Sequence, residues 1–245
     1  MSAMTSISTT AAAESELAEK QTEDCVILLH GLARTSRSMR KIAHVLKDDY
    51  RVINQGYPSR KHPIETLAEL AIPPALKQCT GGGNIHFVTH SLGGILVRQY
   101  LHNNEIPMLG NTVMLGPPNQ GSELADQLSG NPIVDYYNGP AGKQLGTDPN
   151  SVPIKLGAVN FTVGVIAGNK NFRPSFAEVF PGDHDGKVSV ARSKVDGLTD
   201  HLVLPVTHTF MMRNDLVIAQ IQAFLRDGKF APLTPKDTTA QPKEN

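Results

Sequence analysis

Short apolar runs alternate with amphipathic runs along most of this 245-residue chain, and this alternation limits the fold more than any other feature. The apolar runs predict strands at 25–29, 51–53, 85–88, 112–115, 161–166 and 201–204, and the amphipathic runs predict helices at 36–48, 64–79, 92–103 and 214–227. Alternation of this kind builds βα units and a mostly parallel sheet flanked by helices. With 245 residues, of which 40% are hydrophobic, the chain is long enough and apolar enough for one large core. We therefore expect a single α/β domain.

The charge balance and the two ends of the sequence limit the partners. Basic and acidic residues both number 23, so the net charge of zero argues against nucleic acid or a polybasic membrane contact. The first residues lack a basic stretch followed by an apolar one, and no apolar run reaches the roughly 20 residues of a membrane span. We expect a soluble, cytoplasmic protein. Cys25 and Cys79 are interpreted as buried free thiols, since cysteine often serves as a small core residue.

Composition also predicts the domain bounds. Residues 1–24 are rich in Ser, Thr, Ala and Glu, and residues 229–245 contain few apolar groups. Such segments bury too little surface to fold firmly, so we expect a loosely ordered N-terminal segment, a domain at 25–228 and a flexible tail.

Ser91 stands at the most informative position, inside the stretch NIHFVTHSLGGILVR that joins a predicted strand to a predicted helix. A very tight strand-to-helix turn needs small residues around its corner, because a large side chain would collide there. Thr89 lies two residues before the serine, Gly93 lies two after it, and Gly94 follows. The corner residue then points out over the carboxyl edge of the sheet, at the start of the next helix. The stretch therefore predicts a nucleophile elbow.

These residues resemble the G-x-S-x-G motif of the α/β-hydrolase superfamily, in particular its small bacterial lipases and esterases, with Thr89 in place of the first glycine. The resemblance covers roughly residues 25–227. It implies a minimal α/β-hydrolase fold with about six mostly parallel strands and helices on both faces, and a catalytic site that needs no cofactor or metal. In this superfamily the nucleophile is followed along the chain by an acid and then by a histidine.

A serine becomes a nucleophile only with a base that an acid orients. Four histidines follow Ser91, namely His102, His184, His201 and His208, and His208 comes directly after the last predicted strand, where the superfamily keeps its histidine. The segment from Asp185 to Val188 resembles the D-G-x-V pattern around the triad aspartate of small lipases, which favours Asp185 as the acid and leaves Asp183 as the alternative. A calcium loop is disfavoured because its regularly spaced ligands are missing.

The reaction also needs N–H donors for the developing oxyanion. The amide of Leu92 follows the nucleophile at a helix start, and Leu32 lies in the segment after the first strand, whose H-G-x sequence resembles the lipase oxyanion loop. We interpret His30 as a brace of that loop rather than as a second base.

Two further segments bear on the substrate. Residues 116–122 (GPPNQGS) are similar to the P-N-x-G-S stretch of triacylglycerol lipases. The insertion at about 119–158 is expected to form a lid-like loop beside the acyl pocket, because long connections without periodicity usually have a function. Arg34, Arg37, Arg40 and Lys41 form a basic cluster, which we interpret as a solvated helix face, with an anionic substrate group near Arg34 and Arg37 as the alternative.

The sequence thus predicts a serine hydrolase that cleaves small-molecule or lipid carboxylic esters through Ser91, His208 and Asp185. Thioesterase, amidase and acyltransferase activities stay open, because the same triad serves each of them. A non-catalytic ligand receptor of the same fold is the alternative from another class. The acyl chain, the alcohol and the oligomeric state are left open.

Overall fold

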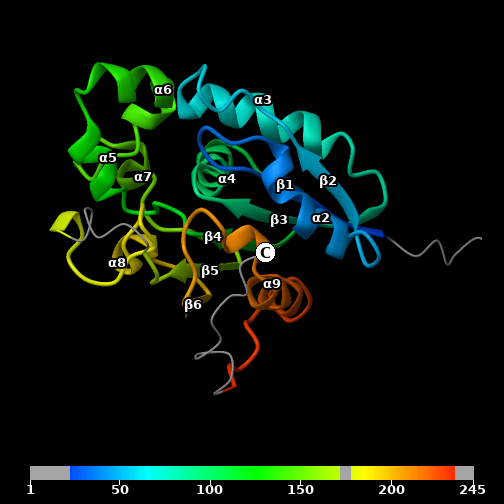
Figure 1. Cartoon of the computed structure of the whole chain (residues 1–245). Helices are drawn as coiled ribbons and strands as arrows, with labels where there is room; N and C mark the ends of the chain where they lie inside the picture. Colours follow the sequence, from blue (N-terminus) through cyan, green and yellow to red (C-terminus); the bar gives the residue numbers. More distant parts are fainter. Residues whose placement is uncertain (1–22, 172–177, 235–245) are drawn as a thin grey trace, which may run out of the picture.

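A computed structural model describes residues 23–171 and 178–234 (Figure 1). Its centre is one sheet of six strands in the order β2-β1-β3-β4-β5-β6, and all neighbouring strands are parallel. The strands are β1 (Glu23–Leu29), β2 (Arg51–Gln55), β3 (Gly82–His90), β4 (Leu109–Leu115), β5 (Val163–Gly168) and β6 (Asp200–Leu204). The expected α/β architecture with a six-stranded parallel sheet is confirmed.

Helices cover both faces of the sheet because its central strands are apolar on both sides. On β1, Ile27 and Leu29 face a core formed with α3 (Ile64–Leu76) and α4 (Leu92–Asn103). Val26 and Leu28 point to the other face, where they meet α2 (Arg40–Leu46) and α9 (Asp215–Asp227). Figure 1 shows α3 and α9 on opposite sides of the sheet.

Local signals begin and end the last helix. The Asn214 side chain accepts a hydrogen bond from the Val217 amide, which satisfies one of the first N–H groups of α9. Gly228 ends the helix with φ of 67°, a left-handed conformation that glycine adopts without strain.

Most predicted elements differ by a few residues in their bounds, and two of these differences have a local cause. The fifth strand runs over 163–168 rather than 161–166, because its ladder with β4 begins at the pair Thr112 and Val163. Helix α3 ends at Leu76, three residues before the predicted end, and contains Pro73 and Pro74 in its last turn. Tighter turns then carry the chain to Cys79, whose amide donates to the Leu76 carbonyl.

The insertion at about 119–158 contains three short helices instead of an irregular loop. They are α5 (Glu123–Leu128), α6 (Pro132–Lys143) and α7 (Val152–Lys155). Gly139 interrupts α6 with φ of 67°, which hides the helical period in the sequence. Beyond this kink the insertion packs on α3, since the Gln144 side chain accepts the Ile64 amide at 2.6 Å.

The interpretation of both cysteines as free thiols is wrong. Cys25 in β1 and Cys79 after α3 form a disulfide across 54 residues of sequence, with Cα atoms 5.6 Å apart. The chain enters β3 soon after Cys79, and β3 pairs with β1, so the sheet itself brings the cysteines together. Disulfides persist mainly in oxidising compartments, and the bond therefore weighs against the expected cytoplasmic location. Among the described helices, none is long and apolar enough to cross a membrane.

Most of the two predicted terminal segments lies outside the described residues. Residues 23 and 24, at the end of the predicted N-terminal segment, belong to β1. From the predicted tail the structure describes 229–234, where Phe230 is buried against Phe224 of α9 with ring centroids 4.9 Å apart.

Candidate active site

Ser91 lies at the corner between β3 and α4, with φ of 53° and ψ of −120°. A side chain rarely adopts this left-handed conformation, and the cost is tolerated where the surrounding structure holds it. The Ser91 amide donates to the Leu115 carbonyl of β4 at 2.9 Å. Gly93 allows the tight approach, because a Cβ there would lie 2.6 Å from the Leu29 carbonyl oxygen. The geometry is that of the predicted elbow, with buried Thr89 in the first small position.

Asp185 and His208 form a buried pair. Nδ1–H of His208 donates to Oδ2 of Asp185 at 2.8 Å, and both side chains are at least 96% buried. The other carboxylate oxygen accepts the amides of Lys187 and Val188, each at 2.9 Å. The His208 amide also donates to the Asp185 carbonyl at 3.0 Å. Both carboxylate oxygens and the backbone carbonyl of Asp185 are therefore hydrogen-bonded. These bonds fix the tautomer and the orientation of the His208 imidazole.

The remaining candidates from the sequence lie in other surroundings. Asp183 is exposed, and His102 is exposed on α4. His184 stacks on Phe180 with ring centroids 4.1 Å apart. His201 lies 3.0 Å from the Ser193 hydroxyl, and burial lowers its pKa. Of the candidates that the sequence offered, Asp185 and His208 are the two that form an acid–imidazole pair beside Ser91.

His90, the residue before Ser91, connects the elbow with His208 and was missed in the sequence. Its ring lies 4.7 Å from the His208 ring, and its Nε2–H donates to the His208 carbonyl at 3.0 Å. Because a carbonyl only accepts, Nδ1 carries the lone pair, and this buried atom has no hydrogen-bond partner within the part of the chain that the structure describes. Burial, and then the neighbouring His208, hold the pKa of His90 well below its usual range. His90 is therefore a neutral contact between the Ser91 corner and His208.

The Ser91 hydroxyl and the His208 imidazole are not hydrogen-bonded to each other in the structure. Such bonds are often long in enzymes without substrate and shorten in the substrate complex.

The loop after β1 presents a free amide. The Arg34 amide donates to the Gly31 carbonyl at 3.2 Å, which closes a turn around Leu32 and Ala33. Ala33 has φ of 54°, and its amide donates to Oγ of buried Ser59 at 3.1 Å. The Leu32 amide has no acceptor among the described residues. A Cβ on Gly31 would lie 3.1 Å from the Cβ of Ser91, so this turn is packed directly against the elbow.

Leu92 supplies the other predicted donor. It is the first residue of α4, and the first amides of a helix have no acceptor within it. The helix dipole adds partial positive charge at this end, so an oxyanion placed here is stabilised.

His30 braces the turn, as the sequence analysis predicts. Its ring stacks on Tyr57 with centroids 4.1 Å apart, and Nδ1–H donates to the Gly31 carbonyl at 2.9 Å. Nε2 accepts the Tyr57 amide, and the Tyr57 hydroxyl donates to the His30 carbonyl. Burial lowers the pKa of His30. With both nitrogens engaged, this histidine is not available as a base.

The P-N-x-G-S stretch at 118–122 is hydrogen-bonded to the loop around Asp185 and to the short helix after it. The Ser122 hydroxyl donates to the Lys187 carbonyl at 2.7 Å, and the Asn119 amide group donates to the Ser193 carbonyl at 2.8 Å. Arg98 of α4 donates to the Asn119 carbonyl and to the Pro153 and Gly157 carbonyls at 2.7–3.1 Å. Burial lowers the pKa of Arg98 to about 10. This network joins α4, the insertion and the Asp185 loop, a role that sequence reasoning missed.

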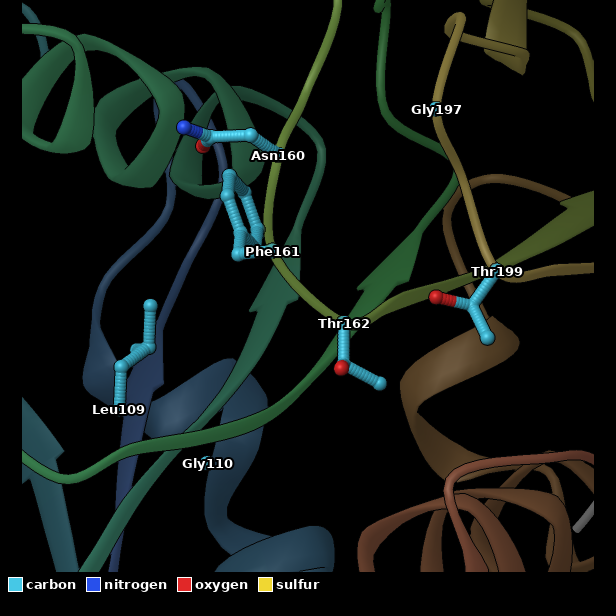
Figure 2. Close-up of a pocket in the computed structure, with 7 residues that line it drawn as sticks. All are labelled: Leu109, Gly110, Asn160, Phe161, Thr162, Gly197 and Thr199. Atoms are coloured by element: carbon cyan, nitrogen blue, oxygen red, sulfur yellow. The ribbon is translucent and has the colours of Figure 1, made fainter.

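A cavity of about 500 Å³ lies away from this site, at the start of the strands rather than at their ends. Figure 2 shows its lining, which is Leu109, Gly110, Asn160, Phe161, Thr162, Gly197 and Thr199. These residues precede or begin β4, β5 and β6, whereas Ser91 and His208 follow β3 and β6. The cavity therefore belongs to the opposite edge of the sheet. Within residues 23–171 and 178–234, no group of three or more His, Cys, Asp or Glu side chains could hold a metal ion.

Comparisons with known proteins find likeness in structure but not in sequence. No protein-family model and no curated protein matches the chain. The propeptide form of the lipase BlEst2 from Bacillus licheniformis is 19% identical with a TM-score of 0.66, over 87% of this chain and 52% of that one. Phospholipase PlaB from Legionella pneumophila is 17% identical with a TM-score of 0.63, over 84% of this chain and 60% of that one.

A structure from the pair of metagenome-derived lipolytic enzymes LipS and LipT is 17% identical with a TM-score of 0.55, over 84% of this chain and 94% of that one. The chain thus spans about half of the BlEst2 propeptide form and three fifths of PlaB. The likeness establishes the α/β-hydrolase fold.

Proposed function

Because the chain has the α/β-hydrolase fold, we propose that it is a serine hydrolase of carboxylic esters, with Ser91 as nucleophile, His208 as base and Asp185 as the orienting acid. The observation that carries this proposal is the buried hydrogen bond between His208 and Asp185 beside the left-handed Ser91. A buried aspartate bonded to Nδ1 of a histidine leaves Nε2 of that ring for the serine proton.

In the proposed acylation, Oγ of Ser91 bonds to the ester carbonyl carbon while its proton passes to Nε2 of His208. Asp185 stabilises the imidazolium without taking its proton. The carbonyl π electrons move onto the oxygen, where the amides of Leu32 and Leu92 bind the negative charge. Each such donor lowers the barrier by about 2.7–4 kcal/mol.

The tetrahedral intermediate then collapses. The bond from carbon to the alcohol oxygen breaks, and the departing alcohol takes the proton from His208, which leaves an acyl-enzyme on Ser91. In the second half, His208 accepts a proton from water as the water oxygen bonds to the acyl carbon. Collapse releases the carboxylic acid and returns the proton to Ser91.

Esters are favoured over the other acyl substrates by the neighbouring structures, which are described as a lipase, a phospholipase and lipolytic enzymes. The residue pattern itself serves thioesters and amides equally well. The receptor alternative requires a pocket without reactivity, and a strained serine beside a buried His–Asp pair gives no advantage to such a protein.

The test is hydrolysis of p-nitrophenyl esters from acetate to palmitate and of emulsified triacylglycerol by the wild type and Ser91→Ala. We expect the substitution to lower kcat by about 10⁴-fold or more, because the nucleophile is lost. A fluorophosphonate should label the wild type and leave Ser91→Ala unlabelled. The same residual rate in both proteins, or labelling of both, contradicts the assignment of Ser91. If the wild type is labelled yet inert on esters, thioesters and amides become the substrates to test.

A further inference from the structure

The four basic residues of the predicted cluster have different surroundings in the structure. They follow or end the turn from Gly31 to Arg34, which is called the oxyanion turn below. Lys41 pairs with Asp215 of α9 at 2.6 Å and donates to the Arg213 carbonyl. Arg37 and Arg40 are exposed, as expected for a solvated face. Arg34 is instead half-buried and ends the turn that presents the Leu32 amide. One member of the cluster therefore belongs to the site rather than to the helix surface.

The guanidinium of Arg34 has no hydrogen-bond or carboxylate partner among the described residues. The buried Arg98 and the half-buried Arg192 both have partners. Arg98 donates to backbone carbonyls, and Arg192 donates to the Glu123 carboxylate and the Gln120 carbonyl. Removing a cation partly from water without a partner costs free energy. A ligand group that pairs with Arg34 would recover that cost.

Arg34 also lies within electrostatic reach of the reacting groups. Its positive charge acts on His90, whose ring lies 4.7 Å from the ring of His208. Its amide is bonded to Gly31, which packs against Ser91. An anion on Arg34 would therefore lie close to an ester that is bound between Ser91 and Leu32.

We propose that Arg34 binds an anionic group of the substrate, a carboxylate or a phosphate, beside the scissile ester. The inference rests on the proposed ester hydrolysis and narrows its substrate class to esters that carry a negative charge near the reacting carbonyl. Arginine suits this role because its planar guanidinium donates two parallel hydrogen bonds to carboxylate or phosphate oxygens. The group comes either from the acyl part, as in a dicarboxylic half-ester, or from the alcohol part, as in a glycerophosphate ester.

The experiment compares charged substrates with neutral substrates of the same ester type. Mono-p-nitrophenyl glutarate against p-nitrophenyl valerate tests an acyl-side anion, and dibutyryl glycerophosphate against dibutyryl glycerol tests an alcohol-side anion. For each pair the readout is the ratio of kcat/KM for the charged ester to that for the neutral one. We expect Arg34→Ala to lower the ratio about 10- to 100-fold in one pair, since hydrogen bonds to charged groups are among the strong ones. The pair that responds identifies the source of the anion.

Arg37→Ala is the matched control, since it removes a cation of the same type three residues away and should change each ratio less than twofold. Arg34→Lys keeps the charge without the fork, so its ratio should lie between those of Arg34→Ala and the wild type. Equal losses on charged and neutral esters, or no change in either ratio, overturn the proposal while the ester hydrolase stands. A wild type that is inert on all four esters overturns both proposals. Thermal midpoints of the variants within a few degrees of the wild type show that they fold.

Discussion

The sheet has one histidine–aspartate pair near the carboxyl ends of its strands, here called the carboxyl edge, and another toward the amino ends, the amino edge. The two pairs differ in what surrounds them. At the carboxyl edge His208 and Asp185 are 2.8 Å apart and almost fully buried. At the amino edge His86 and Asp24 are 3.4 Å apart, and the Asp24 side chain is 34% exposed. The His86 ring also accepts the Asn111 amide through Nδ1 at 2.9 Å, so both of its nitrogens face a partner.

The two pairs consist of the same residue types, so their surroundings decide that the carboxyl edge is the better place for catalysis. Parallel strands end where the following helices begin, so the carboxyl edge gathers helix N-termini and the sharp turn at Ser91. The amino edge has neither of these, and next to Asp24 it holds the disulfide of Cys25. We therefore expect substitutions at the carboxyl edge to affect activity and substitutions at the amino edge to affect stability.

The strongest test exchanges the acid of each pair for its amide. Asp185→Asn should lower kcat about 10⁴-fold, because an amide stabilises the wrong tautomer of His208 and cannot balance its charge. Asp24→Asn is the matched control and should leave kcat within twofold of the wild type. Both are measured as steady-state hydrolysis of a p-nitrophenyl ester. Similar losses in the two variants would break the distinction between the edges.

Removal of the disulfide tests the amino edge. The double variant Cys25→Ala, Cys79→Ala should lower the free energy of unfolding by about 4 kcal/mol, because the bond closes a loop across 54 residues of the unfolded chain. Denaturant unfolding measures this change, and kcat of the folded variant should stay near the wild-type value. Activity that falls much further than the folded fraction would mean that the disulfide acts on the carboxyl edge.

Low pH should lower the free energy of unfolding, because two histidines near the carboxyl edge are buried. His90 and His30 have lowered pKa values, chiefly because burial disfavours the charged ring. Below a pH of about 6.5 the unfolded chain binds protons that the folded protein does not, so stability falls with falling pH by up to about 1.4 kcal/mol per unit for each such histidine. Unfolding curves between pH 7 and 5 measure the slope. His90→Gln, which keeps a donor for the His208 carbonyl but does not titrate there, should flatten it, and an unchanged slope would contradict the neutral state of His90.

The smallest expected effect concerns the oxyanion turn. Ser59→Ala removes the acceptor of the Ala33 amide, and the cost of a lost hydrogen bond is about 1 kcal/mol. We expect kcat to fall about fivefold with little change in KM, since in the proposed mechanism the turn binds the oxyanion of the transition state. Ser38→Ala, an equal deletion on the neighbouring helical turn, serves as the control. A rise in KM at constant kcat would place Ser59 in substrate binding instead.

Local patterns in the sequence predicted the elements around the elbow well. Strand β3 ends at His90 and α4 begins at Leu92, in agreement with the predicted corner at Ser91. The helices of the insertion were missed because Gly139 and Pro140 interrupt the period of α6, and because α5 and α7 are too short to show one. The disulfide was missed because 54 residues separate Cys25 from Cys79.

By itself the sequence determined the βα order and the tight turn at Ser91, because periodicity and turn sterics act over a few neighbouring residues, and the resemblance to α/β-hydrolases supplied the candidates for an acid and a base. Only the tertiary structure decided that Asp185 rather than Asp183 pairs with His208, and that His90 and Ser59 support the site. It also separated Arg34 from the solvated cations of its cluster. These outcomes depend on which groups come into contact after the sheet has formed. Contacts between residues that are far apart along the chain cannot be read from the local pattern of a single sequence.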